Sequence, residues 1–181
     1  MIKLTATLII CYTTLAFGQG KKNDIKEKVK TDFELIDYKL STDTLTLISS
    51  SDFLHYPFGV FKDNKALKKE YPNLFNLKNG FPYLTLGDSY VKFFFDDDKK
   101  RLETVYAKIT NPEIRLRNGI ATGMTKYEVL TRFFNSSLDN ADNLKVLRLE
   151  SGLLGMWHYY TFDNNVLTSI YFDTDYQLDK N

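Results

Sequence analysis

The side chains that most often carry out catalysis are scarce in this chain. Its 181 residues include two histidines, His55 and His158, and a single cysteine, Cys11. The histidines lie in different halves of the sequence without a distinctive serine or aspartate partner. Neither a G-x-S-x-G turn nor a glycine-rich phosphate loop is present. We therefore expect a protein with no catalytic residues, no cofactor and no enzymatic activity.

Acidic residues are plentiful, and the most conspicuous cluster is Asp96, Asp97 and Asp98, followed at once by Lys-Lys-Arg. A calcium loop needs spaced oxygen ligands and usually a glycine at the bend, so we expect no metal site here. The pattern favours a solvated hairpin tip whose charges neutralise one another. A carboxylate pair for glycoside hydrolysis stays open as a third function, because the distance between two carboxylates is not readable from sequence.

Aromatic residues, at 15% of the chain, are the best candidates for binding. Residues 156–162 and 166–172 predict a hairpin that turns at Asn164 and Asn165, since asparagine tolerates positive φ. Strict alternation of side chains then gives a core face made of Trp157, Tyr159, Ile170 and Phe172.

The opposite face of this hairpin carries His158, Tyr160 and Tyr171. Large rings with polar tips on an open sheet are typical of a surface that recognises a protein or stacks on a sugar. The alternative is that another element covers this face. We take the three residues as the centre of the predicted binding surface.

Two further stretches extend that surface. Residues 53–61, FLHYPFGVF, are unusually aromatic, so we add His55 and Tyr56; the alternative is that this run fills the core. In the hairpin of residues 90–109, alternation buries Val91, Phe93 and Phe95 and leaves Lys92, Phe94 and Glu103 outside. The predicted binding residues are therefore His55, Tyr56, Phe94, His158, Tyr160 and Tyr171.

Two helix starts must position these strands. Thr125 and Glu128 have the spacing of a capping box, ahead of a helix whose inward face continues to Phe134. Asp63 can cap another helix, which ends at Pro72. Residues 33–48 add one or two strands ahead of both helices.

Each predicted helix is followed by strand-like segments in the same order. These are residues 83–86, 90–95 and 102–109 in the first half, and 144–149, 156–162 and 166–172 in the second. The shared order predicts an α+β fold of two tandem helix-plus-antiparallel-sheet repeats, with the helices packed on one face of the sheet.

The pattern I-x-x-G-M-T-K-x-E-V-L over residues 120–130, followed by an aromatic hairpin, carries a resemblance. It resembles the helical opening of exported modules in the SmpA/OmlA outer-membrane assembly family and in β-lactamase-inhibitor-protein-like domains. The resemblance covers residues 120–172, and residues 58–109 by element order alone. Phe134-Asn135 replaces the Gly-Pro pair that often follows such helices. The resemblance implies a concave sheet face open to partners, and it supports fold more than function.

The first residues of the chain predict export from the cytoplasm. Residues 1–18 contain Lys3, a short apolar stretch and small residues at Ala16 and Gly18, as in a cleavable signal peptide. The apolar stretch is shorter than the ~20 residues of a spanning helix. No small residue directly precedes Cys11, which argues against a lipoprotein. The expected organisation continues with a polar leader over 19–30, N-terminal strands and a first repeat over 31–110, and a connector and second repeat over 111–181.

Charge and composition narrow the function. With 24 Lys and Arg against 23 Asp and Glu, the chain lacks the basic surplus of a nucleic-acid binder. We expect a periplasmic or secreted protein, not inserted in a membrane after cleavage, that binds another envelope or secreted protein as an inhibitor, immunity or assembly factor. The alternative is a carrier or sensor of a small apolar or sugar ligand, which a closed apolar cavity of about 300 Å³ or more would favour.

Overall fold

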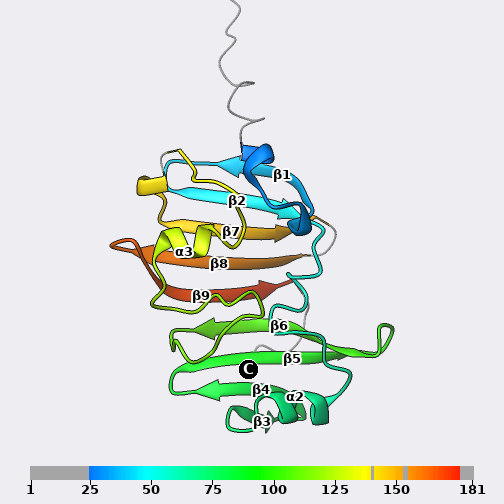
Figure 1. Cartoon of the computed structure of the whole chain (residues 1–181). Coiled ribbons are helices and arrows are strands. Elements are labelled where there is room, and N and C mark those ends of the chain that lie inside the picture. The colour runs from blue at the N-terminus through cyan, green and yellow to red at the C-terminus, as the bar shows by residue number, and fades with distance from the viewer. Residues whose placement is uncertain (1–24, 140, 153–154, 176–181) are drawn as a thin grey trace, which may run out of the picture.

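The computed structural model describes residues 25–139, 141–152 and 155–175, which form one continuous nine-stranded sheet (Figure 1). The strand order is β1-β2-β7-β8-β9-β6-β5-β4-β3. Neighbouring strands run antiparallel except β2 and β7, which run parallel. The fold is therefore a mixed sheet with few helices.

The strands are β1 (Leu35–Leu40), β2 (Thr44–Ser49), β3 (Phe75–Lys78), β4 (Phe81–Leu86), β5 (Ser89–Asp96), β6 (Arg101–Ile109), β7 (Val146–Ser151), β8 (Met156–Asp163) and β9 (Val166–Thr174). The helices include α2 (Asn64–Glu70) and α3 (Lys126–Leu130), with 3₁₀ turns η1 (Thr31–Phe33) and η2 (Ala141–Asn143). Residues 25–28 are also helical.

The prediction of two tandem helix-plus-sheet repeats is wrong. Strands β1 and β2 from the start of the chain join β7 from its second half, so the halves interleave in a single sheet. They meet again where β6 pairs with β9, with Ala107 opposite Phe172. A three-stranded unit leaves unpaired backbone groups along both edges, and pairing edge to edge satisfies them. The order of elements along the chain carries no information about that pairing.

The predicted positions of individual helices agree with the structure better than the predicted arrangement of strands does. The Asp63 carboxylate caps α2 by accepting a hydrogen bond from the amide of Ala66 at 2.8 Å. Thr125 and Glu128 form the predicted capping box at α3. The helix ends at Leu130, earlier than expected, although Phe134 is still buried. Strand β3 was not among the predicted strands, and its residues are mostly exposed.

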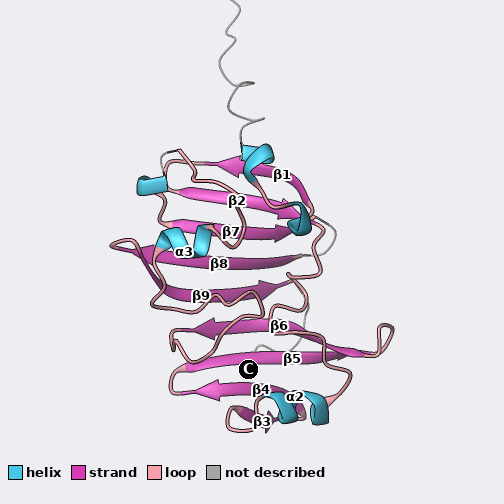
Figure 2. Cartoon of the chain, in the orientation of Figure 1, coloured by secondary structure: helices cyan, strands magenta, loops and turns pink. Residues whose placement is uncertain are grey.

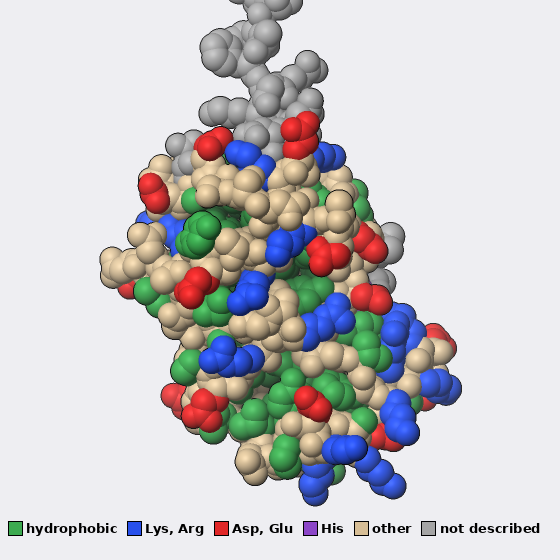
Figure 3. Space-filling model, viewed as in Figure 1, with side chains coloured by type: hydrophobic (Ala, Val, Ile, Leu, Met, Phe, Trp, Pro, Cys, Tyr) green, Lys and Arg blue, Asp and Glu red, His purple; other side chains and the backbone are tan. Residues whose placement is uncertain are grey.

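Helices α2 and α3 lie on the same side of the sheet, which we call the covered face (Figure 2). The opposite side is called the outer face. Beneath the helices and loops of the covered face lie buried phenylalanines that include Phe53, Phe58, Phe93, Phe133 and Phe172. Lys and Arg side chains are interspersed with apolar surface on this side, most densely around α2 and the β5–β6 hairpin (Figure 3).

The predicted signal peptide, residues 1–18, lies outside the described residues. Residues 25–30 of the expected polar leader are described, and they pack onto the domain. Val29 is buried and pairs with Phe134, while the amide of Lys30 donates to the carbonyl of Phe133 at 2.9 Å. Within the described ranges, no helix has the length and apolar content needed to cross a membrane.

Candidate functional site

A β-bulge determines which side chains of the β8–β9 hairpin face outward. The turn lies at Asn164 and Asn165 as predicted, with φ of 47° and 64°. Phe162 pairs with Leu167, but Thr161 pairs with Ser169, so Thr168 is an extra residue. One extra residue moves the remaining side chains of one strand to the opposite face relative to its partner. The predicted faces of β8 are therefore exchanged, while those of β9 hold.

His158 and Tyr160 are core residues, and their predicted place on an open surface is wrong. Both are 0% exposed. The Nε2 of His158 donates to the carbonyl of Leu54 at 2.9 Å, and its ring stacks on Phe172 with centroids 3.7 Å apart. Burial lowers the pKa of His158 to about 3, against the opposing effect of the Leu54 hydrogen bond, so this ring is neutral at neutral pH. Burial likewise raises the pKa of Tyr160.

The segment of residues 53–61 mainly fills the core, which is the alternative that the sequence left open. Tyr56 is buried, and the guanidinium carbon of Arg101 lies 4.2 Å from the centre of its ring. His55 is partly buried, and its Nδ1 contacts the carboxylate of the buried Glu103. Neither predicted binding residue of this segment belongs to an open aromatic face.

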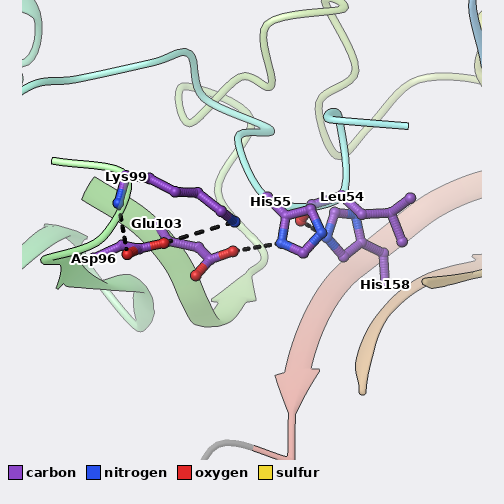
Figure 4. A network of polar contacts seen from close by, with 6 residues as sticks. All are labelled: Leu54, His55, Asp96, Lys99, Glu103 and His158. Atoms are coloured by element: carbon purple, nitrogen blue, oxygen red, sulfur yellow. Dashed lines mark hydrogen bonds and ion pairs between the residues drawn. The ribbon is translucent and has the colours of Figure 1, made fainter. Parts of the chain in front are cut away.

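The contact between His55 and Glu103 is one of several contacts that join residues 53–61 to β6 (Figure 4). The carbonyl of His55 accepts from the amide of Thr104 at 3.1 Å, and that of Phe61 accepts from Leu102 at 2.7 Å. Strand β9 pairs with β6 only from Ala107 to Ile109. The segment thus supplies hydrogen-bond acceptors to the first half of β6, which indicates a structural role for this histidine.

The acidic cluster is a self-neutralising hairpin tip, as predicted. The carboxylate of Asp96 accepts hydrogen bonds from the amides of Asp98 and Lys99, and Lys100 pairs with Asp97 at 3.6 Å. The hydrogen bond from the backbone of Lys99 lowers the pKa of Asp96. Among the described residues, no group of three His, Cys, Asp or Glu side chains is placed to hold a metal ion.

Side-chain facing in the β5–β6 hairpin is only partly as predicted. Val91 and Phe93 are buried, whereas Phe95 is 36% exposed and Glu103 is buried. A register shift between Lys92 and Phe93 makes Val105 an extra residue on β6. The alternation of β5 itself is uninterrupted, so Phe94 lies on the outer face as expected.

Tyr171 also lies on the outer face, where it belongs to a continuous set of rings. Its ring centroid is 6.0 Å from that of Tyr159 and 5.2 Å from that of Tyr106, which in turn stacks on Tyr90 at 5.5 Å. The four residues come from the adjacent strands β8, β9, β6 and β5, and each is partly exposed. We call them the tyrosine row.

Cations and further rings border the tyrosine row. The guanidinium carbon of Arg148 lies 5.6 Å from the ring centre of Tyr159, and the exposed Lys108 pairs across the sheet with Tyr90 and Tyr171. Farther along the outer face, the ring of Phe94 lies 6.5 Å from that of Phe81, and the ammonium of Lys92 lies over Phe81 at 4.4 Å. The outer face therefore combines aromatic area with positive charge.

The hydroxyls of Tyr90 and Tyr106 in the tyrosine row are protonated at neutral pH. Burial, followed by a hydrogen bond with Tyr106, raises the pKa of Tyr90 to about 12. Burial and a hydrogen bond with Tyr171 raise the pKa of Tyr106. Each hydroxyl can thus act as a donor or an acceptor toward a bound molecule.

Tyr90, Tyr106 and Tyr159 were missed from the sequence. Tyr90 shares its strand face with Phe94, two alternations along β5, and this spacing was a usable signal. Tyr106 is separated from the predicted turn by the bulge at Val105, so counting alternation from that turn assigns its ring to the core. Tyr159 is assigned to the core because a ladder without the extra residue Thr168 places it on the same face as Ile170 and Phe172.

A cleft of about 450 Å³ lies between α3 and the tip of the β8–β9 hairpin. Its lining includes Leu130, Leu138 and Val166, together with Lys126. The ammonium of Lys126 donates to the carbonyls of Ala141 and Asp142, both at 2.9 Å. This cleft is large enough to be the ligand site that the carrier alternative requires.

No protein-family model, curated protein or solved structure matches this chain. The resemblance of residues 120–172 to the SmpA/OmlA family and the β-lactamase-inhibitor-protein-like domains stays a prediction.

Proposed function

We propose that this chain is an exported, non-catalytic protein of the periplasm or medium that recognises another protein through its outer face. The observation that carries the proposal is the tyrosine row, four partly exposed rings in continuous contact across four adjacent strands. An inhibitor, immunity or assembly role fits such a surface.

The physical chemistry of the row favours protein recognition. A tyrosine offers a large apolar area and a polar tip, and it has only two side-chain torsions to fix on binding. Neighbouring rings already restrict those torsions here, which lowers the entropy that binding would remove. The rings stand on strands rather than loops, so their spacing is held by the sheet.

The charges around the row specify the kind of partner. Lys108 and Arg148 lie beside the tyrosines, although Glu150 pairs with Arg148 at 2.9 Å. Opposite charges across an interface speed association and select partners. Arg148 is already paired, and the charge of Asp173 also acts on Tyr106. We therefore expect the partner to present an apolar centre with an acidic side chain that meets Lys108.

The cleft near α3 supports the carrier alternative less well. Its volume is within the range of small-molecule sites, and part of its lining is apolar. However, it lies at the tip of a hairpin beside a lysine, instead of forming a closed cavity between helices and sheet. A small apolar ligand bound there would be independent of the tyrosine row.

A hydrolase with a carboxylate pair receives no support from the acidic groups whose pKa is shifted. Such an enzyme needs one carboxyl with a raised pKa. The pKa of Asp96 is lowered by a backbone hydrogen bond, and that of Glu128 is lowered by the hydroxyl of Thr125. We therefore keep the proposal of a binding protein.

Affinity capture from the envelope extract of the source cell tests the proposal. The bait is the mature chain, compared with a Tyr106→Ala/Tyr171→Ala variant and with Tyr127→Ala, a 66% exposed tyrosine on α3. A partner retained by the wild type and the Tyr127→Ala control, but lost by the double variant, supports the tyrosine row. A partner retained equally by all three baits contradicts it, provided that urea unfolding shows every variant folded.

A further inference from the structure

A second cleft, of about 290 Å³, lies apart from the tyrosine row. Four segments distant in sequence meet there: η1, residues 51–53, the turn near Asn118, and the chain just after α3. None of its lining residues belongs to the row, so the cleft is a separate feature of the molecule.

Three phenylalanines form the floor of this cleft. The ring of Phe133 packs edge-on against Phe33 with centroids 5.3 Å apart, and against Phe53 at 6.0 Å. All three are buried. Rings held in this way offer a rigid apolar surface, which a flat apolar group can cover at low entropic cost.

Two arginines, Arg117 and Arg132, line the cleft beside that floor. The guanidinium carbon of Arg117 lies 5.6 Å from the ring centre of Phe53. Arg132 packs on Gly119, where an added Cβ would lie 3.6 Å from its Nη2. Within the described residues, neither arginine takes part in an ion pair closer than 4.0 Å. This distinguishes them from the cations of the β5–β6 hairpin tip, which are paired with its aspartates.

The remaining polar groups refine the expected ligand. The side-chain oxygen of Asn118 accepts a hydrogen bond from the amide of Ile120 at 3.3 Å, which leaves its NH₂ group as a donor. The exposed carboxylate of Asp32 also lines the cleft and offsets one of the two positive charges. The cleft therefore carries a net positive charge above an aromatic floor.

We propose that this cleft binds a small aromatic carboxylate. The carboxylate would pair with the guanidinium groups of Arg117 and Arg132, whose planar N–H donors match two carboxylate oxygens. The ring of the ligand would cover the phenylalanine floor. The volume is close to the lower end of small-molecule sites, which suits one ring with a short acidic arm better than a larger molecule.

Calorimetric titration of the mature chain with 3-phenylpropionate and with its uncharged amide tests the proposal. We expect the acid to bind at least about 10-fold more tightly than the amide, because only the acid forms charge-assisted hydrogen bonds. Arg117→Gln and Arg132→Gln should each weaken binding of the acid by about 10-fold. Asp32→Asn should strengthen it by about 3-fold, since a like charge is removed.

The matched control is Arg115→Gln, which removes an exposed arginine two residues from Arg117 that does not line the cleft. Its affinity for the acid should equal that of the wild type. Equal binding of acid and amide, or an Arg115→Gln loss as large as those at Arg117 and Arg132, would overturn the proposal. Since all three arginines are exposed, unchanged urea midpoints should show that each variant folds.

Discussion

The two faces of the β8–β9 hairpin treat their rings differently. On the covered face, His158 and Phe172 stack at 3.7 Å, and neither is more than 1% exposed. On the outer face, Tyr159 and Tyr171 lie 6.0 Å apart and stay partly exposed. The buried histidine donates a hydrogen bond from Nε2 to a backbone carbonyl and remains neutral, whereas the outer tyrosines keep polar tips at the surface. The two faces therefore differ in how far they expose their rings, since polar rings occur on both.

The largest effect should come from deleting single residues of β9. Deleting Tyr171 would move Phe172 to the outer face and bring Asp173 toward the core, so we expect a loss of more than about 5 kcal/mol of stability, enough to unfold the domain. Deleting Thr168 removes only the extra residue and leaves Phe162 opposite Leu167, and Thr161 opposite Ser169. That deletion should cost about 1 kcal/mol.

Urea unfolding followed by far-ultraviolet circular dichroism measures both deletions. Deleting the exposed Thr168 removes one side-chain hydrogen bond, from its hydroxyl to the carbonyl of Thr161 at 3.1 Å. If removing Thr168 unfolds the domain as completely as removing Tyr171, then the bulge itself is required and not merely tolerated, and the comparison of the two faces must include its bend.

Local chemistry made individual helix starts and one turn predictable. The capping residues Asp63 and Thr125 predict their helices because their side chains accept hydrogen bonds from the first backbone amides, which have no acceptor within the helix. Asn164 and Asn165 predict a tight turn because asparagine tolerates positive φ, which both residues adopt. Each of these signals involves residues within a few positions of one another, so one sequence contains all the information needed.

Pairing between distant strands and the outcome of bulges were not predictable in this way. The parallel contact of β2 with β7 depends on edges that are far apart in the chain. His158 and Tyr160 were assigned outward because a regular ladder and a bulged ladder have the same local pattern. The predicted binding residues were the least accurate part of the prediction, because one extra residue in a strand exchanges its core and surface positions. Of the six predicted residues, only Tyr171 and Phe94 lie on the outer face.

Substituting neighbours on β9 gives the next largest contrast. Phe172→Ala should destabilise the domain by about 3–5 kcal/mol, because it leaves a cavity against His158 and Phe58. Tyr171→Ala removes cross-strand ring contacts at the surface and should cost about 1 kcal/mol. Urea midpoints with unchanged slopes provide the values. Equal losses at the two positions would mean that the outer face is as closely packed as the covered face.

Acid sensitivity at His158 gives the smallest of the three contrasts, and it tests the covered face directly. The pKa of this ring falls from 6.5 in the unfolded chain to about 3 in the fold, because burial opposes the charged form. As the pH drops through 6.5, the unfolded chain therefore takes up a proton that the folded chain does not, and stability declines. Between about pH 7.5 and pH 5, this should cost about 2 kcal/mol. His158→Gln keeps a donor for the Leu54 carbonyl but does not titrate, so its unfolding free energy should fall less with acid by that amount. Parallel curves for the wild type and the variant would instead show that the folded ring accepts the proton as readily as the unfolded one, and the neutral, closed interior assigned to this face would have to be abandoned.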